Sequence, residues 1–289
     1  MMGGFASLVV ISVLIIACDA IGRRSQPAAA ALKPPATVAA PAPAAAVESN
    51  SDQRELKSLP QLKFYTNGRC PYAQRTWIVL KELGVPYEHK DVVLGKDNKE
   101  AWFKQMNPNG KVPVVQYFDD VVYESNVCNE YLAETFQSSL MPADLQQRAR
   151  MRIVMQRVDA FVKAFYLYLS CNKPKKEAML KQKLMDEIAF LEMMLKANAS
   201  KSSWFVGDKM TLADIALFPF VERAAATHGA FKKVGWEELL KGSRAFLAWY
   251  KKMLTVKSVQ ETMGKKEQFV EMYKGMLKNQ YFQRALATV

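Results

Sequence analysis

Residues 61–83 read QLKFYTNGRCPYAQRTWIVLKEL, and this stretch decides the fold of the chain. Polar and apolar residues alternate over positions 61–65, which is the period of a half-buried strand. Apolar residues then recur at helical spacing over positions 71–83, until Gly84 interrupts the pattern. The stretch therefore predicts a strand that leads almost directly into a helix, with Cys70 at the junction.

Cys70 stands immediately before this helix and is the candidate catalytic residue. Proline is favoured as the first helical residue because it has no N–H to leave unpaired, so Pro71 makes Cys70 the N-cap. There the sulfur faces free N–H groups and the positive end of the helix dipole, which predicts a pKa below the usual ~8.5. A buried cysteine that acts as a small hydrophobic residue is the alternative, and we favour it for Cys128 and Cys171.

The third residue after Cys70 is Ala73, so the helix start holds no Cys-x-x-Cys pair. A lone thiolate cannot close a disulfide within such a motif. It forms a mixed disulfide with its substrate, and a second small thiol must release it. This spacing favours monothiol chemistry with glutathione.

The following segments extend the pattern to a complete small domain. We predict strands at 87–94, 112–117 and 121–123 and helices at 100–106 and 125–136, which gives the order βαβαββα of a thioredoxin-like domain over residues 58–138. Strand signals fade beyond residue 142. Segments rich in Met, Leu, Ala and Lys predict helices near 144–170, 176–197, 212–227, 236–254 and 266–278. The expected fold is α+β, with an all-helical domain over residues 143–289.

The N-terminal part of the chain is expected to lie outside this fold. Residues 1–18 carry no charged side chain, and their apolar run is shorter than the ~20 residues of a membrane span. We therefore predict a signal peptide over residues 1–20, with an uncleaved anchor as the alternative. Residues 21–57 are rich in Ala and Pro, which predicts either a linker or a targeting segment. The predicted route is into the endomembrane system, with onward transport to a plastid or another organelle left open.

Composition excludes several classes of protein. Half of the 289 residues are hydrophobic, which excludes wholesale disorder, and four scattered cysteines exclude a disulfide scaffold. The two histidines lie far apart and no cysteine pair has ligand spacing, so no metal site is expected. The net charge of +12 suits an anionic small molecule, a nucleic acid or a membrane surface. The lysines follow no nucleic-acid-binding motif, so we interpret them as a solvated surface and expect no nucleic-acid partner.

Three motifs in this order resemble one family. They are CPYAQR at 70–75, NPNGKVPV at 107–114 and YESN at 123–126, and together they are similar to the cysteine-type glutathione transferases of the omega and lambda classes. The resemblance extends from about residue 62 to beyond Tyr273 and includes VGDKMTLAD at 206–214 and PFVER at 219–223. It implies the glutathione transferase fold, glutathione as co-substrate, no metal and a homodimer.

The resemblance also implies a glutathione-binding set. Val112 would pair with the cysteinyl backbone of glutathione at a cis-proline step, and Glu124 with Ser125 would hold the γ-glutamyl end. Lys99 would face the glycyl carboxylate. A proline at a strand start, a plain helix cap and an exposed lysine are the corresponding alternatives. The full set is Tyr72, Lys99, Val112, Pro113, Glu124 and Ser125.

A second-substrate pocket is expected between the two domains. The resemblance implies Arg223 as a pocket residue, with Phe269 and Tyr273 as nearby aromatics that line the pocket or belong to the core. The tryptophan that the family carries in this region has no counterpart, because Lys266 stands there. Thr211-x-x-Asp214 is similar to a capping box, which predicts a helix start with no role in the chemistry.

These observations predict a glutathione-dependent thiol transferase or dehydroascorbate reductase that acts through a mixed disulfide of Cys70 with glutathione. The acceptor would be a small molecule or a glutathionylated protein. The alternatives are a membrane-associated relative similar to the chloride intracellular channel proteins and a non-catalytic glutathione-binding relative. Membrane contact is expected through the N-terminus only.

Overall fold

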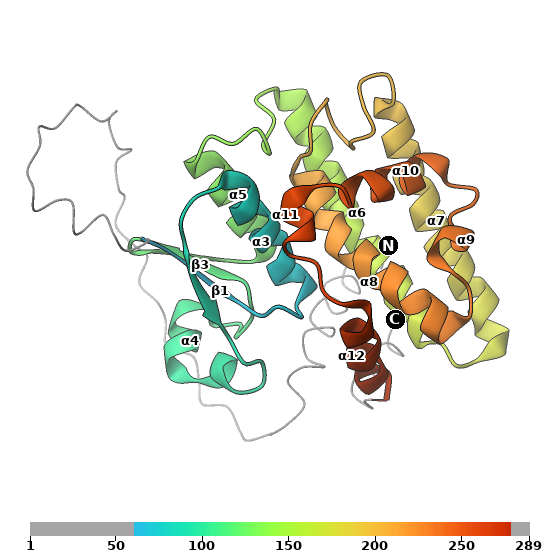
Figure 1. The fold of residues 1–289 in the computed structure, drawn as a ribbon, viewed down its shortest axis with the longest axis horizontal. Helices are drawn as coiled ribbons and strands as arrows, with labels where there is room; N and C mark the ends of the chain where they lie inside the picture. Colours follow the sequence, from blue (N-terminus) through green and yellow to red (C-terminus); the bar gives the residue numbers. More distant parts are fainter. Residues whose placement is uncertain (1–60, 279–289) are drawn as a thin grey trace, which may run out of the picture.

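The computed structural model describes residues 61–278. The predicted signal peptide and the Ala/Pro-rich segment fall outside the described residues, and the predictions made for them stay predictions. A sheet with three helices is followed by a second part built of helices, and the two lie side by side in Figure 1. This architecture confirms the expected α+β fold.

Four short strands form one mixed sheet. They are β1 (Leu62–Thr66), β2 (Glu88–Asp91), β3 (Val114–Tyr117) and β4 (Asp120–Tyr123). Their order in the sheet is β2-β1-β3-β4, where β1 and β2 are parallel and the other pairs are antiparallel. Two parallel strands need a crossover connection, and α3 (Pro71–Leu83) supplies it.

Helices cover both faces of this sheet. Alternate residues of β1 are buried, and Phe64 packs into the main core beneath α3 and α5 (Ser125–Thr135). On the other face, Phe103 of α4 (Ala101–Met106) packs with Val112 and Val114 in a smaller core, against which Cys70 also lies. The short 3-10 helix η1 (Asp97–Lys99) precedes α4 and was not predicted.

The second part centres on one buried helix. Its members are α6 (Leu145–Ser170), α7 (Pro174–Asn198), α8 (Leu212–Lys232), α9 (Trp236–Leu239), α10 (Arg244–Met253), α11 (Lys257–Gln260) and α12 (Lys266–Lys278). Helix α8 is buried along most of its length and touches α6, α12 and α3. A helix that is apolar on all sides is expected at the centre of a bundle. Because α8 also touches α3, it joins the two domains.

The helix predicted over 236–254 is two helices, α9 and α10, and that part of the prediction is wrong. The chain turns at 240–243 before α10 begins. A side chain on another helix accepts hydrogen bonds from two backbone N–H groups in the first turn of α10. Glu192 on α7 accepts hydrogen bonds from the backbone N–H groups of Ala245 at 3.2 Å and Phe246 at 2.6 Å. Periodicity alone carries no sign of this interaction, because the acceptor lies on another helix.

The start of α8 is the predicted capping box. Thr211 and Asp214 exchange the two reciprocal bonds of that motif. The Asp214 carboxylate also accepts from the backbone N–H of Phe205 at 3.2 Å and from the indole Nε1 of Trp249 at 2.9 Å. Burial raises the pKa of Asp214 to about 6, against the hydrogen bonds that lower it. One carboxylate therefore ties α8 to the preceding loop and to α10.

Replacement of Asp214 tests this role. We expect Asp214→Ala to lower the free energy of unfolding by about 2 kcal/mol or more, because buried N–H donors lose their acceptor. Urea unfolding followed by circular dichroism measures the change. Asp208→Ala, which alters an exposed carboxylate in the same loop, should change it by less than about 0.5 kcal/mol. Equal effects of the two substitutions would contradict the assignment.

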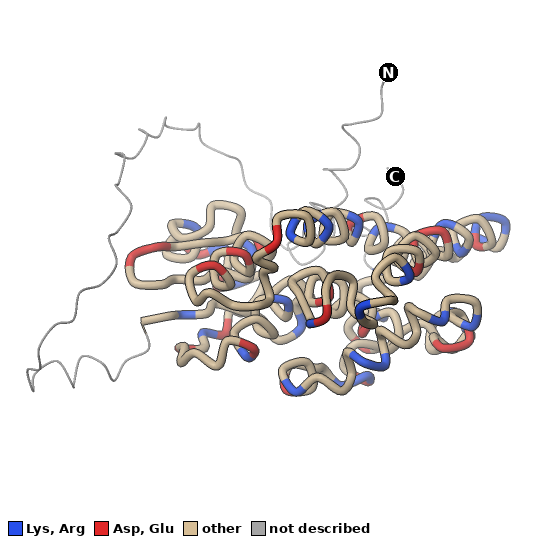
Figure 2. The backbone as a smooth tube through the Cα atoms, turned by 90° about the horizontal axis from the view of Figure 1, so that it is seen from above, with Lys and Arg blue, Asp and Glu red and all other residues tan. Residues whose placement is uncertain are grey.

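Charged residues are distributed over both domains. Figure 2 shows Lys and Arg positions interspersed with Asp and Glu positions along the elements of each. Several form surface pairs, such as Arg152 with Glu130 and Lys81 with Glu261. Between residues 61 and 278, no helix combines the length and the apolar character that a bilayer span requires.

Candidate functional site

A cavity of about 570 Å³ lies where the two domains meet. Its volume falls in the usual range for small-molecule sites. The sheet domain contributes loops and helix starts, and the helical domain contributes one residue of α6 and three of α12. Its wall includes Arg69, Cys70, Tyr72, Lys111, Val112, Pro113, Glu124, Ser125, Tyr166, Met272, Tyr273 and Met276.

Cys70 is the N-cap of α3 and lines this cavity, as predicted. A tight turn fixes its backbone, because its N–H donates to the carbonyl of Asn67 at 2.9 Å. The Asn67 side chain donates in turn to the carbonyl of Val92 at 3.0 Å, which anchors the turn to the end of β2. The Cys70 thiol points toward the carbonyl oxygen of Val112, 3.9 Å from the sulfur.

The predicted low pKa of Cys70 is wrong for the protein without ligand. Burial raises the pKa of the Cys70 thiol above its ordinary value, and this effect outweighs those that oppose it. The N–H groups of Ala73 and Tyr72 lower the pKa, as a helix start should, and the charges of Arg223 and Arg75 do the same. The local sequence indicates the helix start. It does not show that α6 and α12, far along the chain, line the cavity on which the half-buried Cys70 stands.

The direction of this shift can be measured. Because a raised pKa leaves less thiolate at neutral pH, we expect the rate of Cys70 alkylation by iodoacetamide to keep rising with pH beyond the ordinary midpoint of ~8.5. Peptide mass spectrometry of glutathione-free protein gives the rate at Cys70, with N-acetylcysteine as the reference thiol. A midpoint at or below that of N-acetylcysteine would contradict the burial argument.

The loop at 107–113 is held by asparagine side chains. Asn107 donates to the carbonyl of Lys111 at 2.8 Å, and Asn98 donates to the carbonyl of Gly110 at 2.8 Å. Gly110 has φ +61°, and a Cβ atom there would lie 2.8 Å from the carbonyl oxygen of Asn98, so the position requires glycine. The Val112–Pro113 peptide bond that follows is cis, as predicted.

Glu124 and Ser125 stand together at the start of α5 and line the cavity. Glu124 has φ +70°, a conformation that costs a non-glycine residue about 1–3 kcal/mol and is concentrated at functional sites. Its carboxylate accepts from the side chain of Asn109 at 3.3 Å, and the Ser125 hydroxyl accepts from Arg75 at 3.1 Å. These groups and the helix start offer a carboxylate and free N–H groups to one end of a zwitterionic ligand.

Two basic residues differ from expectation. Lys99 ends η1 and is not part of the cavity wall, whereas Lys111 lines the cavity and was not predicted. Lys111 lies within the NPNGKVPV motif, so its place between Gly110 and Val112 was the available signal. Together with Arg69, it gives the cavity two cationic side chains.

Tyr72 lines the cavity, and its ring packs on the helical domain. The ring meets Phe220 of α8 edge-on, with centroids 5.0 Å apart, and the guanidinium of Arg75 lies 5.0 Å from its centroid. Its hydroxyl is buried and has no hydrogen-bond partner among residues 61–278. Burial raises the pKa of Tyr72, so this hydroxyl stays protonated.

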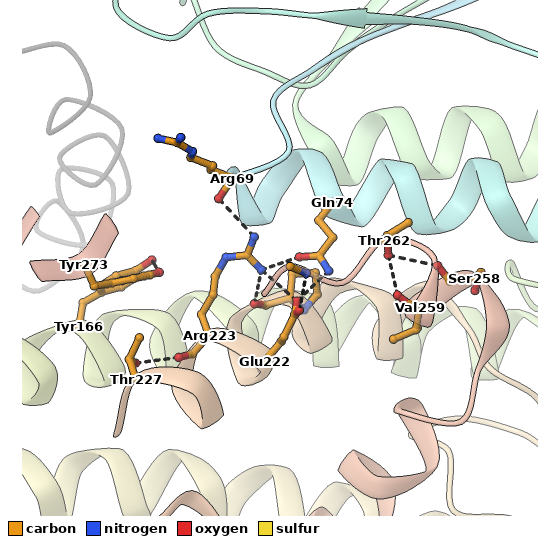
Figure 3. Close-up of polar contacts among 12 residues, drawn as sticks. Arg69, Gln74, Tyr166, Glu222, Arg223, Thr227, Ser258, Val259, Thr262 and Tyr273 are labelled. Atoms are coloured by element: carbon orange, nitrogen blue, oxygen red, sulfur yellow. Dashed lines mark hydrogen bonds and ion pairs between the residues drawn. The ribbon is translucent and has the colours of Figure 1, made fainter. Parts of the chain in front are cut away.

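The opposite wall carries a pair of tyrosines. Tyr166 of α6 and Tyr273 of α12 join their hydroxyls at 2.7 Å, and their rings stack with centroids 5.8 Å apart (Figure 3). The thioethers Met272 and Met276 extend this wall. Tyr273 therefore lies where it was expected. Tyr166 was missed, since one tyrosine in a long predicted helix gives no signal.

Arg223 and Phe269 lie behind the cavity wall rather than on it. Neither residue is among those that line the cavity, and the Arg223 guanidinium sits 4.4 Å from the centroid of the Phe269 ring. The sequence pattern could not show this, because the depth of a side chain depends on what α12 covers. Among the described residues, no group of three His, Cys, Asp or Glu side chains could hold a metal ion.

The chain is similar to known proteins in both sequence and structure. Two family models match the chain: "Glutathione S-transferase, N-terminal domain" over residues 69–135 and "Glutathione S-transferase, C-terminal domain" over residues 149–252. Glutathione S-transferase omega-1 of Sus scrofa is 29% identical over 167 residues, which are 57% of this chain and 68% of that protein. Glutathione S-transferase L3 of Arabidopsis thaliana is 32% identical over 163 residues, 56% of this chain and 66% of that protein. The crystal structure of glutathione transferase Omega 3C from Trametes versicolor is 28% identical, with a TM-score of 0.67, over 80% of this chain and 96% of that one.

Proposed function

Because the chain belongs to the glutathione S-transferase family, we propose that it is a glutathione-dependent thiol transferase of the omega and lambda type. Dehydroascorbate reduction is proposed as a second reaction of the same site. One observation carries this proposal: a single cysteine stands at a helix start inside the interdomain cavity, with Ala73 where a resolving cysteine would be. Such a thiol suits exchange with glutathione more than the formation of an internal disulfide.

We propose that glutathione lies along the sheet-domain wall of the cavity. The backbone N–H and C=O groups of Val112 would pair with its cysteinyl residue, which places the glutathione sulfur beside Cys70. Glu124 would accept from the ammonium of the γ-glutamyl residue, and the start of α5 at Ser125 would hold its carboxylate. Lys111 supplies a positive charge for a ligand carboxylate.

The exchange then proceeds in two displacements. The Cys70 thiolate attacks the glutathione sulfur of a mixed disulfide, forms the Cys70–glutathione disulfide and releases the acceptor as a thiolate that takes up a proton. A second glutathione thiolate attacks the bound glutathione sulfur, which yields oxidised glutathione and restores the Cys70 thiolate. With dehydroascorbate, two glutathione molecules supply the two electrons and two protons of the reduction.

The two alternatives to a thiol transferase are a channel-like relative and a non-catalytic glutathione carrier. The comparisons give no support to the channel-like alternative, and a non-catalytic carrier would bind glutathione without turnover. A homodimer stays a prediction. The acceptor, whether a small molecule or a glutathionylated protein, is part of the proposal, and we place it on the α12 side of the cavity, where half-buried Met272 and Met276 stand beside the buried Tyr166–Tyr273 pair.

Replacement of the nucleophile tests the proposal directly. We expect Cys70→Ser to reduce turnover of a glutathione mixed disulfide by about 100-fold or more, because serine cannot form the mixed disulfide. Intact-mass measurement after incubation with oxidised glutathione should show one adduct at Cys70 in the wild type. Cys171→Ser, which alters a thiol that is not on the cavity wall, is the matched control and should keep its turnover. Unimpaired turnover in Cys70→Ser would overturn the proposal.

The glutathione-binding end can be tested separately. We expect Glu124→Gln to raise the KM for glutathione about tenfold with a smaller change in kcat, because a charge-assisted hydrogen bond to the ammonium is lost. Steady-state kinetics with varied glutathione measures both constants. Asp119→Asn, an equal change of charge on the exposed hairpin, serves as the control. An unchanged KM in Glu124→Gln would remove Glu124 from the binding set.

A further inference from the structure

We propose that Arg223 is a positioning residue that, together with Glu222, holds the Cys70 loop and helix α12 in one arrangement and makes no contact with the second substrate. The inference rests on the proposed function, since it concerns how the nucleophile and the acceptor wall are held relative to each other. It replaces the expectation that Arg223 lines the second-substrate pocket. Figure 3 shows the polar contacts that carry it.

The first set of contacts holds both flanks of Cys70. Arg223 donates from Nη2 to the carbonyl of Arg69 at 3.2 Å, and from Nη1 to the side-chain oxygen of Gln74. Gln74 donates its own backbone N–H to the carbonyl of Cys70 at 3.0 Å. The residue before the nucleophile and the first turn after it are therefore tied to the same guanidinium.

The second set of contacts holds the segment that leads into α12 and the first turn of that helix. Glu222 accepts from the backbone N–H of Gly264 at 3.0 Å, and Phe269 lies over the Arg223 guanidinium. The fit at this point is close, because a Cβ atom on Gly264 would lie 2.3 Å from Cζ of Phe269. One turn beyond Phe269, α12 presents Met272 and Tyr273 to the cavity. The ion pair thus links the Cys70 loop to the helix that carries the acceptor wall.

The two sets meet in a closed network. The Glu222 carboxylate accepts from Arg223 at 3.2 Å and from the Gln74 amide at 2.7 Å, and all three side chains are buried. A buried ion pair contributes little net stability compared with apolar residues of the same size, so its presence calls for another explanation. A guanidinium offers donors in a rigid planar fork, which suits simultaneous contact with Arg69, Gln74 and Glu222.

The same geometry explains why Arg223 does not meet the substrate. Phe269 lies over one face of its guanidinium, and the two Nη atoms donate to protein oxygens, including the carbonyl of Pro219 at 2.8 Å, while Nε is buried without a hydrogen-bond partner among residues 61–278. Its charge still acts on the sulfur, because it lowers the pKa of Cys70 against the effect of burial. Arg223 therefore acts through Cys70 and α12.

Kinetics can separate positioning from binding. Gln74→Met keeps the ion pair but cuts its link to α3, and Arg223→Lys keeps a cation without the fork. In both variants we expect kcat for the mixed disulfide of glutathione and 2-mercaptoethanol to fall about tenfold, since small misplacements of reacting groups are costly. The KM for that disulfide should stay within about threefold of the wild-type value.

Thr227→Val is the matched control, because Thr227 lies one turn along α8 and bonds to the Arg223 carbonyl only. Its kinetics should match the wild type.

Alkylation of Cys70 gives a readout that needs no turnover. The double variant Glu222→Gln, Arg223→Met removes both charges at once, so no buried carboxylate is left unpaired. We expect its alkylation midpoint to lie at higher pH than that of the wild type, because the cation that favours the thiolate is gone. Thermal unfolding followed by circular dichroism checks that each variant is folded.

The outcomes are distinct. A rise in KM with unchanged kcat in Gln74→Met or Arg223→Lys would overturn the inference and return Arg223 to the substrate pocket. An unchanged alkylation midpoint in the double variant, or equal losses in Thr227→Val, would also overturn it. A wild type without turnover would refute the proposed function, while the alkylation comparison would still decide whether Arg223 acts on Cys70. If Arg223→Lys does not fold, Gln74→Met decides the kinetic test.

Discussion

The packing of α3 against α8 is the constraint on which the site depends. Arg75 of α3 shows why: its guanidinium donates to the carbonyl of Ala216 on α8 at 2.8 Å and to the Ser125 hydroxyl on α5 at 3.1 Å. A buried guanidinium is tolerated only where such partners are present. Cys70 begins the same helix, so the docking of the two domains sets its position. The cavity exists because this docking leaves space between the start of α3 and the inner face of α12.

Two opposite effects meet at the Cys70 sulfur. The helix start and two arginines favour the thiolate, whereas burial in the interdomain cavity favours the neutral thiol. The balance lies with the neutral thiol in the protein without ligand. A ligand that brought polar groups into the cavity would change the solvation of the sulfur, and the reactivity of Cys70 would then depend on occupancy of the cavity as well as on the helix. Arg75 and Arg223 thus act on the Cys70 sulfur as well as on the domain interface.

The sequence predicted the elements whose signals are local. The alternation of polar and apolar residues predicted β1, and Pro71 and Gly84 predicted the two ends of α3. Thr211 and Asp214 predicted the start of α8. The resemblance to the omega and lambda classes was confirmed, and so was the cis bond before Pro113.

What could not be predicted depends on contacts between distant segments. The pKa of Cys70, the depth of Arg223, the tyrosine that pairs with Tyr273 and the break before α10 all arise from tertiary packing. Lys111 is the exception, because it lies within the NPNGKVPV motif at 107–114. Site residues on loops next to motifs could therefore be predicted from the sequence. Those on the helical wall could be predicted only where the family resemblance included them.

The cap that Glu192 provides has a consequence for how the helical domain opens. The amide protons of Ala245 and Phe246 belong to α10, but their acceptor is carried by α7. They become available for exchange with solvent only when the two helices separate or the glutamate swings away. These two amides are thus native reporters of the α7–α10 contact, and neither they nor Glu192 line the cavity. Hydrogen exchange at this pair distinguishes an opening of the bundle from a motion confined to the site.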